Sequence, residues 1–187
     1  MSRNSVLNTP PKPARGNPAG FTAVLAAACL LAASVLHASP LPHLSNFEAV
    51  GSGTMRFLGL RLYDATLWSP GGVWSASQPY ALELVYARSF GGAAIAQRSI
   101  EEIAKLRPFP SPTLARWEQQ MRALFPDVKD GDRLTGVRTP GAGVSFYSGT
   151  RKLGQIDDEA FADAFFGIWL SPATRAPNLR AQLLKSP

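Results

Sequence analysis

The stretch Tyr80-Ala-Leu-Glu-Leu-Val-Tyr-Ala87 alternates between large apolar side chains and smaller or charged ones. Successive side chains of an extended chain point to opposite faces, so one face would carry Tyr80, Leu82, Leu84 and Tyr86. This pattern predicts a β-strand with one face buried against a core.

Upstream, residues 51–68 are predicted to form two extended segments that separate at Gly59. The stretch Arg61-Leu-Tyr-Asp-Ala-Thr-Leu67 alternates in the same way, and it is predicted to place on one face Arg61, Tyr63, Ala65 and Leu67. Gly51 and Gly53 lack the third glycine of a dinucleotide-binding fingerprint. We interpret them instead as a bulge or a close contact of the sheet.

The order of the remaining elements indicates an α+β fold. A helix is predicted after Gly91-Gly92, with an apolar stripe of Ala93, Ala96, Ile100 and Ile103. A second helix is predicted to take Ser111 as its N-cap and to end before Pro126. Strands are expected at residues 134–137, 144–147 and 153–156, and helices at residues 160–170 and 179–184. Strands, helices, strands and helices in this order predict an antiparallel sheet with the helices gathered on one face.

The first 38 residues have the order of a secretory signal peptide. A basic segment precedes an uninterrupted apolar run over residues 21–35, and small residues follow up to Ala38. As a helix this run spans only about 22 Å, short of the roughly 30 Å hydrocarbon core of a bilayer. We therefore prefer cleavage near Ala38 to a retained membrane anchor or a lipid anchor at Cys29. The chain then divides into a signal peptide (1–38), a linker (39–46) and one domain (47–187), and the protein is periplasmic or secreted, with no stable membrane span.

The charge does not indicate a nucleic-acid partner. Three of the 19 basic residues and none of the 13 acidic residues lie in the first 38 positions, so removal of the leader lowers the net charge from +6 to +3. A charge this small and scattered does not suit a protein that binds a phosphate backbone.

The chain also lacks the side chains for several kinds of catalysis. Cys29 is the single cysteine, and the two histidines are His37 in the leader and His43 in the linker. The domain therefore has no disulfide, no Ser-His-Asp or Cys-His arrangement and no ordinary zinc site. The spacing of an EF-hand calcium loop is absent from Asp127, Asp130 and Asp132. The sequence indicates neither a metal nor another cofactor.

Tyrosines on predicted strands are candidate site residues, because a buried hydroxyl needs a hydrogen-bond partner. They are Tyr63, Tyr86 and Tyr147. Arg61 shares the predicted face of Tyr63, and Arg88 follows Tyr86 closely. Two interpretations stay open: structural hydrogen bonds at a strand edge, or a cleft where arginine and tyrosine receive the carboxylate or phenolate of a ligand.

Four stretches together resemble the bacterial exported branch of the chalcone isomerase-like proteins. They are Gly59-Leu-Arg-Leu-Tyr-Asp-Ala-Thr-Leu-Trp68, Leu82-Glu-Leu-Val-Tyr86, Phe125-Pro-Asp-Val-Lys-Asp-Gly-Asp132 and Phe165-Phe-Gly-Ile-Trp-Leu170. The resemblance runs from residue 47 to residue 184. It implies an open-faced β-sandwich, in which a layer of helices covers one face of a large antiparallel sheet and a ligand cleft lies between them.

The resemblance also bears on catalysis. The plant enzymes of this family cyclise a chalcone to a flavanone, and their cleft supplies an arginine, a threonine, a tyrosine and an asparagine. Matching through Gly59 puts these four positions at or near Gly53, Ala65, Ile95 and Glu102. None retains the family residue, and the loss of one such donor typically costs about 2.7–4 kcal/mol of transition-state stabilisation. We therefore expect no catalytic residues.

Other members of the family are non-catalytic and resemble fatty-acid carriers, which hold a carboxylate with arginine and tyrosine. We accordingly predict an exported binding protein for a small apolar or amphipathic ligand, fatty-acid-like or phenolic. Its ligand contacts are expected from Arg56, Arg61, Tyr63, Tyr86, Arg88 and Arg98. The alternatives are an isomerase or intramolecular lyase with a rebuilt site, and an envelope accessory protein with a filled cleft. The sequence leaves the oligomeric state open.

Overall fold

The computed structural model describes residue 1, residue 41 and residues 44–185. The predicted signal peptide, its cleavage point near Ala38 and half of the predicted linker lie outside these residues. None of the helices between residues 44 and 185 combines the length and the apolar character that a membrane crossing requires.

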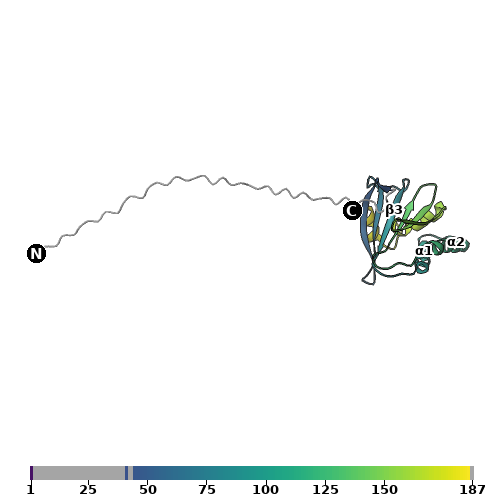
Figure 1. The fold of residues 1–187 in the computed structure, drawn as a ribbon, viewed down its shortest axis with the longest axis horizontal. Helices are drawn as coiled ribbons and strands as arrows, with labels where there is room; N and C mark the ends of the chain where they lie inside the picture. Colours follow the sequence, from purple (N-terminus) through teal and green to yellow (C-terminus); the bar gives the residue numbers. More distant parts are fainter. Residues whose placement is uncertain (2–40, 42–43, 186–187) are drawn as a thin grey trace. The chain divides into compact units, whose positions relative to one another are not determined.

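Strands and helices follow one another along this part of the chain in the predicted order (Figure 1). The strands are β1 (Phe47–Phe57), β2 (Leu60–Pro70), β3 (Tyr80–Tyr86), β4 (Arg133–Arg138), β5 (Val144–Ser148) and β6 (Arg151–Ile156). The helices are α1 (Gly92–Leu106), α2 (Ser111–Leu124), α3 (Glu159–Leu170) and α4 (Pro177–Leu184). Each strand pairs antiparallel with its neighbour in sequence, so the sheet has the order β1-β2-β3-β4-β5-β6. The predicted α+β fold is confirmed.

The larger core lies between one face of the sheet and the helices. It contains side chains from all six strands and all four helices. Helix α3 buries side chains around most of its circumference, as its apolar sequence predicts. Phe165 lies at the centre of an aromatic cluster and contacts the rings of Phe125, Phe146, Phe161, Phe166 and Trp169. Helix α3 is therefore the element that joins the helical layer to the sheet.

A half-buried carboxylate fixes the start of α3. Asp158 is its N-cap, and one side-chain oxygen accepts the backbone N–H of Phe161 at 3.0 Å. The other oxygen accepts from the indole nitrogen of Trp117 at 2.9 Å and from Arg116 at 3.0 Å. Since Trp117 and Arg116 belong to α2, this single side chain ties α2 to α3.

The opposite face of the sheet carries a second, smaller apolar cluster. Its buried members are Leu41, Phe47, Trp68, Ala81 and Val137, and none of them comes from a helix. The helical layer of the described chain therefore covers one face, as an open-faced β-sandwich requires.

Two local predictions for the helices were wrong. Helix α1 buries Ala96, Ser99 and Ile103, whereas Ala93, which was predicted to be on the apolar stripe, is exposed. Gly92 packs against the core at the start of the helix, and this contact fixes which face of the helix points inward. Helix α2 begins at Ser111 itself, and its N-cap is Pro110 without a side-chain hydrogen bond. A proline at the start of a helix costs no hydrogen bond, because the N–H groups of the first turn have no acceptor within the helix.

The interpretation of the two strand glycines is confirmed, although the close contact comes from a helix. The register of β1 and β2 shifts between Ala49 and Gly51, which marks a bulge. Helix α4 passes over both glycines. A Cβ atom at Gly51 would lie 2.2 Å from the carbonyl oxygen of Gln182, and one at Gly53 would lie 2.0 Å from the side-chain oxygen of Gln182. Only residues without a side chain let α4 pack this closely.

We expect Gly51→Ala to lower the free energy of unfolding by about 1–3 kcal/mol, because its methyl group would overlap the backbone of α4. Gly53→Ala is the matched control and should cost less, since the side chain of Gln182 can rotate away. Urea unfolding of the two variants measures the difference. An equal or smaller loss for Gly51→Ala would show that α4 does not pack on β1 as described.

Candidate ligand-binding site

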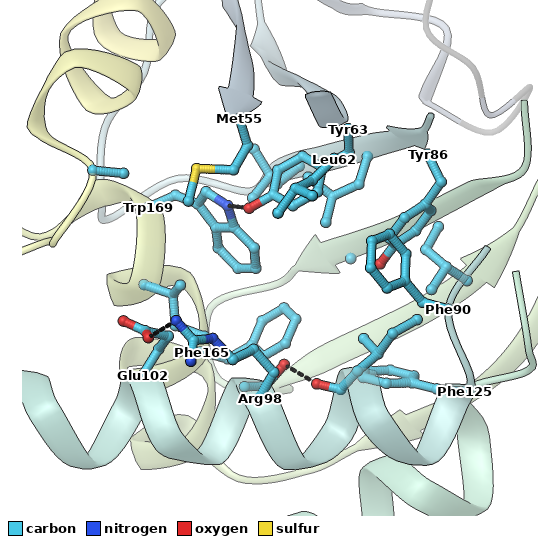
Figure 2. A pocket seen from close by; sticks show the side chains of 18 of the residues that line it. Met55, Leu62, Tyr63, Tyr86, Phe90, Arg98, Glu102, Phe125, Phe165 and Trp169 are labelled. Carbon is cyan, nitrogen blue, oxygen red and sulfur yellow. Dashed lines mark hydrogen bonds and ion pairs between the residues drawn. The ribbon is translucent and has the colours of Figure 1, made fainter. Parts of the chain in front are cut away.

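A cavity of about 640 Å³ lies between the sheet and helices α1 and α3 (Figure 2). The sheet side is formed mainly by Leu82, Leu84, Leu134, Gly136 and Phe146. The helical side is formed by Ala94, Ile95 and Ser99 of α1 and by Phe165, Ile168 and Trp169 of α3. The cavity therefore opens where the family resemblance places a ligand cleft, and most of its lining is apolar.

The cavity exists because α1 is held at both ends. At its start, the backbone N–H of Gly92 donates to Oδ1 of Asp127 at 2.8 Å. A Cβ atom at Gly92 would lie 2.0 Å from the carbonyl oxygen of Phe125, so only glycine permits this approach. At its end, Leu106 packs against α3, where a Cβ atom at Gly167 would lie 3.3 Å from its Cδ1. The middle of α1 thus passes over the sheet with the cavity beneath it.

Tyr63 forms part of the cavity wall. Its hydroxyl oxygen accepts a hydrogen bond from the indole N–H of Trp169 at 3.0 Å. Burial raises the pKa of Tyr63 to about 12, and the hydrogen bond from Trp169 opposes this only in part. The phenol is therefore neutral at physiological pH. It can accept from Trp169 and still donate its own proton to a ligand.

Tyr86 lies beside Tyr63, with ring centroids 6.0 Å apart in an edge-to-face arrangement. Burial raises the pKa of Tyr86, and the neighbouring Tyr63 adds to this shift. No residue in the described part of the chain forms a hydrogen bond with the Tyr86 hydroxyl. Figure 2 shows the Tyr86 side chain extending from its strand into the cavity. Tyr86 thus offers a second neutral phenol, and this one is unpaired.

Three arginines line the cavity and differ in their partners. Arg98 on α1 pairs with Glu102 at 2.7 Å and with Glu101 at 3.1 Å. Arg56 near the end of β1 and Arg175 after α3 have no carboxylate within ion-pair distance among the described residues. The side chain of Arg56 lies on the side of its strand partner Arg61, where its guanidinium donates to the carbonyl oxygen of Gly59 at 3.4 Å and acts electrostatically on Asp64. Arg175 is therefore the cation that an anionic group in the cavity would meet without a carboxylate partner among the described residues.

Of the six ligand contacts predicted from the sequence, four line the cavity: Arg56, Tyr63, Tyr86 and Arg98. Arg61 and Arg88 do not. Arg61 pairs with Asp64, and Arg88 donates from Nε to the carbonyl oxygen of Arg61 at 3.2 Å. The prediction that Arg61 shares the face of Tyr63 was wrong, and the hydroxyl of Tyr63 pairs with Trp169 instead. A ligand-binding role for the six residues stays a prediction.

A bulge explains why Arg61 turns away from the cavity. Leu62 is the extra residue of β2 between the pairs Met55–Tyr63 and Arg56–Arg61. Strict alternation fails at such a point, so both Leu62 and Tyr63 line the cavity. Arg61 instead shares the side of Asp64, to which its guanidinium is bonded.

The four positions matched to catalytic donors supply no such donor. Gly53 lies under α4, and the side chain of Gln182 occupies the space that a larger residue would need. Ala65 is fully buried. Ile95 and Glu102 line the cavity, the first with an apolar side chain and the second in an ion pair. Within the described residues, no group of three or more His, Cys, Asp or Glu side chains is placed to hold a metal ion.

Sequence reasoning missed two polar residues of the site. Trp169 was not identified as a site residue, although an indole N–H in an apolar helix signals that an acceptor must lie nearby. Arg175 follows α3 in the irregular stretch Ser171-Pro-Ala-Thr-Arg175, where no periodic pattern indicates the direction of a side chain. Only the path of the chain after α3 brings this arginine to the cavity.

We expect Tyr63→Phe to lower the free energy of unfolding by about 1–3 kcal/mol, because it leaves the buried N–H of Trp169 without its acceptor. Tyr86→Phe removes the same hydroxyl group one strand away and should change stability by no more than about 0.5 kcal/mol. Chemical denaturation followed by tryptophan fluorescence compares the two. Equal losses would contradict the assignment of hydrogen bonds at the two tyrosines.

Comparison with known proteins agrees with this geometry. The solved structure of a fatty-acid binding protein from Arabidopsis thaliana matches with a TM-score of 0.57 at 12% identity, covering 74% of this chain and 87% of that chain, which shows a shared fold. An uncharacterized protein of Haemophilus influenzae is 29% identical over 148 residues, which cover 79% of this chain and 71% of that protein. The family model described as chalcone isomerase-like matches residues 62–185. This match spans more than half of the chain, and the chain therefore belongs to the chalcone isomerase-like family.

Proposed function

We propose that this chain is an exported, non-catalytic protein that holds a small amphipathic ligand, with a fatty-acid-like tail and one anionic group, in the cavity between the sheet and helices α1 and α3. The observation that carries the proposal is the open apolar cavity of about 640 Å³, lined by Arg175, which has no ion pair among the described residues.

The size and lining of the cavity support an apolar tail. Its volume falls within the roughly 300–1,000 Å³ of ordinary small-molecule sites. Leu84, Phe146 and Ile168 present apolar surface to it, and each methylene group that leaves water contributes about 0.8 kcal/mol. The open volume argues against the alternative of an accessory protein with a filled cleft.

The polar groups support a single anionic group on the ligand. Arg175 supplies positive charge, and Tyr63 and Tyr86 supply neutral O–H donors. A carboxylate bound by arginine and phenol groups forms charge-assisted hydrogen bonds, which are stronger than neutral ones. The Arabidopsis protein that shares the fold is a fatty-acid binding protein, and this supports the same class of ligand here.

The chemistry of the lining supports binding without catalysis. Cyclisation of a chalcone needs donors directed at the charge that develops in the transition state, and the matched positions hold Gly53, Ala65 and Ile95. The phenols do not replace a general base, because burial raises the pKa of Tyr63 to about 12 and keeps this phenol neutral at pH 7. We expect no turnover of a hydroxychalcone by the purified protein.

Export rests on the pattern of the first 38 residues, which lie outside the described part of the chain. Cleavage near Ala38 would leave every described strand and helix intact, since β1 begins at Phe47. The protein would then bind its proposed ligand in the periplasm or outside the cell.

Native mass spectrometry of the protein isolated from the periplasm of an expressing bacterium tests both parts of the proposal. We expect a chain that begins at Ser39, together with a non-covalently bound amphipathic molecule. Ile95→Trp should lower the bound fraction by about tenfold or more, because the larger ring fills the cavity from α1. Ala93→Trp, on the exposed side of the same helix, is the control and should leave the bound fraction unchanged. Protein that stays empty with excess fatty acid, or equal binding by Ile95→Trp, would contradict the proposal.

Replacement of a cavity arginine tests the anionic group. We expect Arg175→Gln to raise the dissociation constant for a long-chain fatty acid about tenfold, because a charge-assisted hydrogen bond is lost. The dissociation constant for the fatty alcohol of equal length should not change. Arg151→Gln removes the same charge at an exposed position of β6 away from the cavity and serves as the control. Calorimetric titration of the unchanged chain and the two variants with acid and alcohol gives six constants, and equal weakening for acid and alcohol would exclude a role for the charge.

A further inference from the structure

The turn between β1 and β2 exposes three large apolar side chains within four residues. Phe57 is 57% exposed, Leu58 is 85% exposed and Leu60 is 49% exposed. The turn has two central residues, Leu58 and Gly59, and both have positive φ angles, 48° and 78°. We call Phe57, Leu58 and Leu60 the hairpin tip.

Folding does not account for a leucine at this position. Two-residue hairpin turns with both φ angles positive favour Asn-Gly or Asp-Gly, because these residues tolerate the left-handed conformation. A leucine is strained there, and its side chain contacts little else, as its exposure shows. Asparagine would suit the backbone better and would remove apolar surface from water. An exposed apolar cluster that is unfavourable both for the backbone of the turn and for its contact with water indicates an interaction site.

Basic residues surround the hairpin tip. Arg56 precedes it and Arg61 follows it, and Arg88 reaches across from the loop after β3 to donate to the carbonyl oxygen of Arg61. The carboxylates that act on this group are Asp64, which pairs with Arg61, and more weakly Asp130. With three arginines and two carboxylates, the residues around the hairpin tip carry a net positive charge.

We infer that the hairpin tip docks on an anionic lipid surface, with Phe57, Leu58 and Leu60 inserted among the acyl chains and the arginines facing the headgroups. Apolar side chains with a basic surround are the combination that peripheral membrane segments use. A protein partner is less well suited, because a two-residue turn offers far less than the roughly 800 Å² per partner of a stable interface.

The hairpin tip lies beside the cavity, so docking of the tip on a membrane would affect access to the cavity. Arg56 and Phe57 also line the cavity, so a docked tip would bring one edge of the cavity to the lipid. The inference goes beyond the proposed function, since membrane docking does not depend on a ligand in the cavity. The experiment below is done without added ligand, so its failure and the failure of ligand binding are distinguishable.

Sedimentation of the full chain with lipid vesicles is the first test. We expect binding to phosphatidylglycerol vesicles, weaker binding to phosphatidylcholine vesicles, and loss of the difference at high salt. Leu58→Asn should lower the partition onto phosphatidylglycerol about tenfold and should not lower the unfolding midpoint, because asparagine suits the turn. The stability measurement separates loss of docking from loss of fold.

Val73→Asn is the matched control. Val73 is 71% exposed, and it lies just past the opposite end of β2 from the tip. The substitution Val73→Asn removes the same kind of exposed apolar side chain, and the partition of this variant onto vesicles should equal that of the unchanged chain. All variants share the same N-terminal residues, so any attraction of those residues for lipid is common to them.

A local probe completes the test. In a Cys29→Ser background, a nitroxide attached at Leu60→Cys should become accessible to oxygen in phosphatidylglycerol bilayers and shielded from a nickel chelate in water. The same label at Val73→Cys should remain in water. Equal partition of Leu58→Asn and the unchanged chain, or a label at position 60 that stays in water, overturns the inference. So does a dimer that Leu58→Asn dissociates in the absence of vesicle binding, since that outcome assigns the tip to a contact between two copies.

Discussion

The attachment of α1 at both ends is the constraint on which the site depends. Gly92 approaches the carbonyl oxygen of Phe125 and donates its N–H to Asp127, while Leu106 packs against α3. A helix held in this way cannot settle onto the sheet to exclude the remaining space. Protein interiors normally close-pack, so a cavity of about 640 Å³ inside a domain of this size needs such a brace.

The C-terminal helix makes the opposite contribution, because it packs directly on β1, on the same face of the sheet, and leaves no space there. Helix α4 lies on β1 where Gly51 and Gly53 have no side chains, and Gln182 fills the space above them. The resemblance predicts the family's catalytic arginine position at Gly53, where any side chain would meet Gln182 and Leu179 of α4.

The electrostatics of the cavity follow from burial. Tyr63 and Tyr86 lose contact with water, which raises the pKa of both phenols and keeps them as neutral donors. Charge is carried by arginines, and Arg98 is already paired with glutamates of its own helix. The site thus combines an apolar interior, neutral donors and a cation without a carboxylate partner, which suits retention of an amphipathic molecule better than proton transfer.

Alternation along the strands and the apolar character of residues 160–170 were enough to predict the antiparallel sheet, the buried helix α3 and the α+β class, because these patterns depend on neighbours in sequence. Tyr63 and Tyr86 were identified for the same reason. Arg61 was placed on the wrong face because the bulge at Leu62 depends on pairing with β1. Arg175, the bond from Trp169 to Tyr63 and the cavity itself arise from segments that meet only in the folded chain. The sequence by itself determined which faces are apolar. Only the tertiary structure decided which polar groups converge and where space remains, because both depend on distances between elements far apart in the chain.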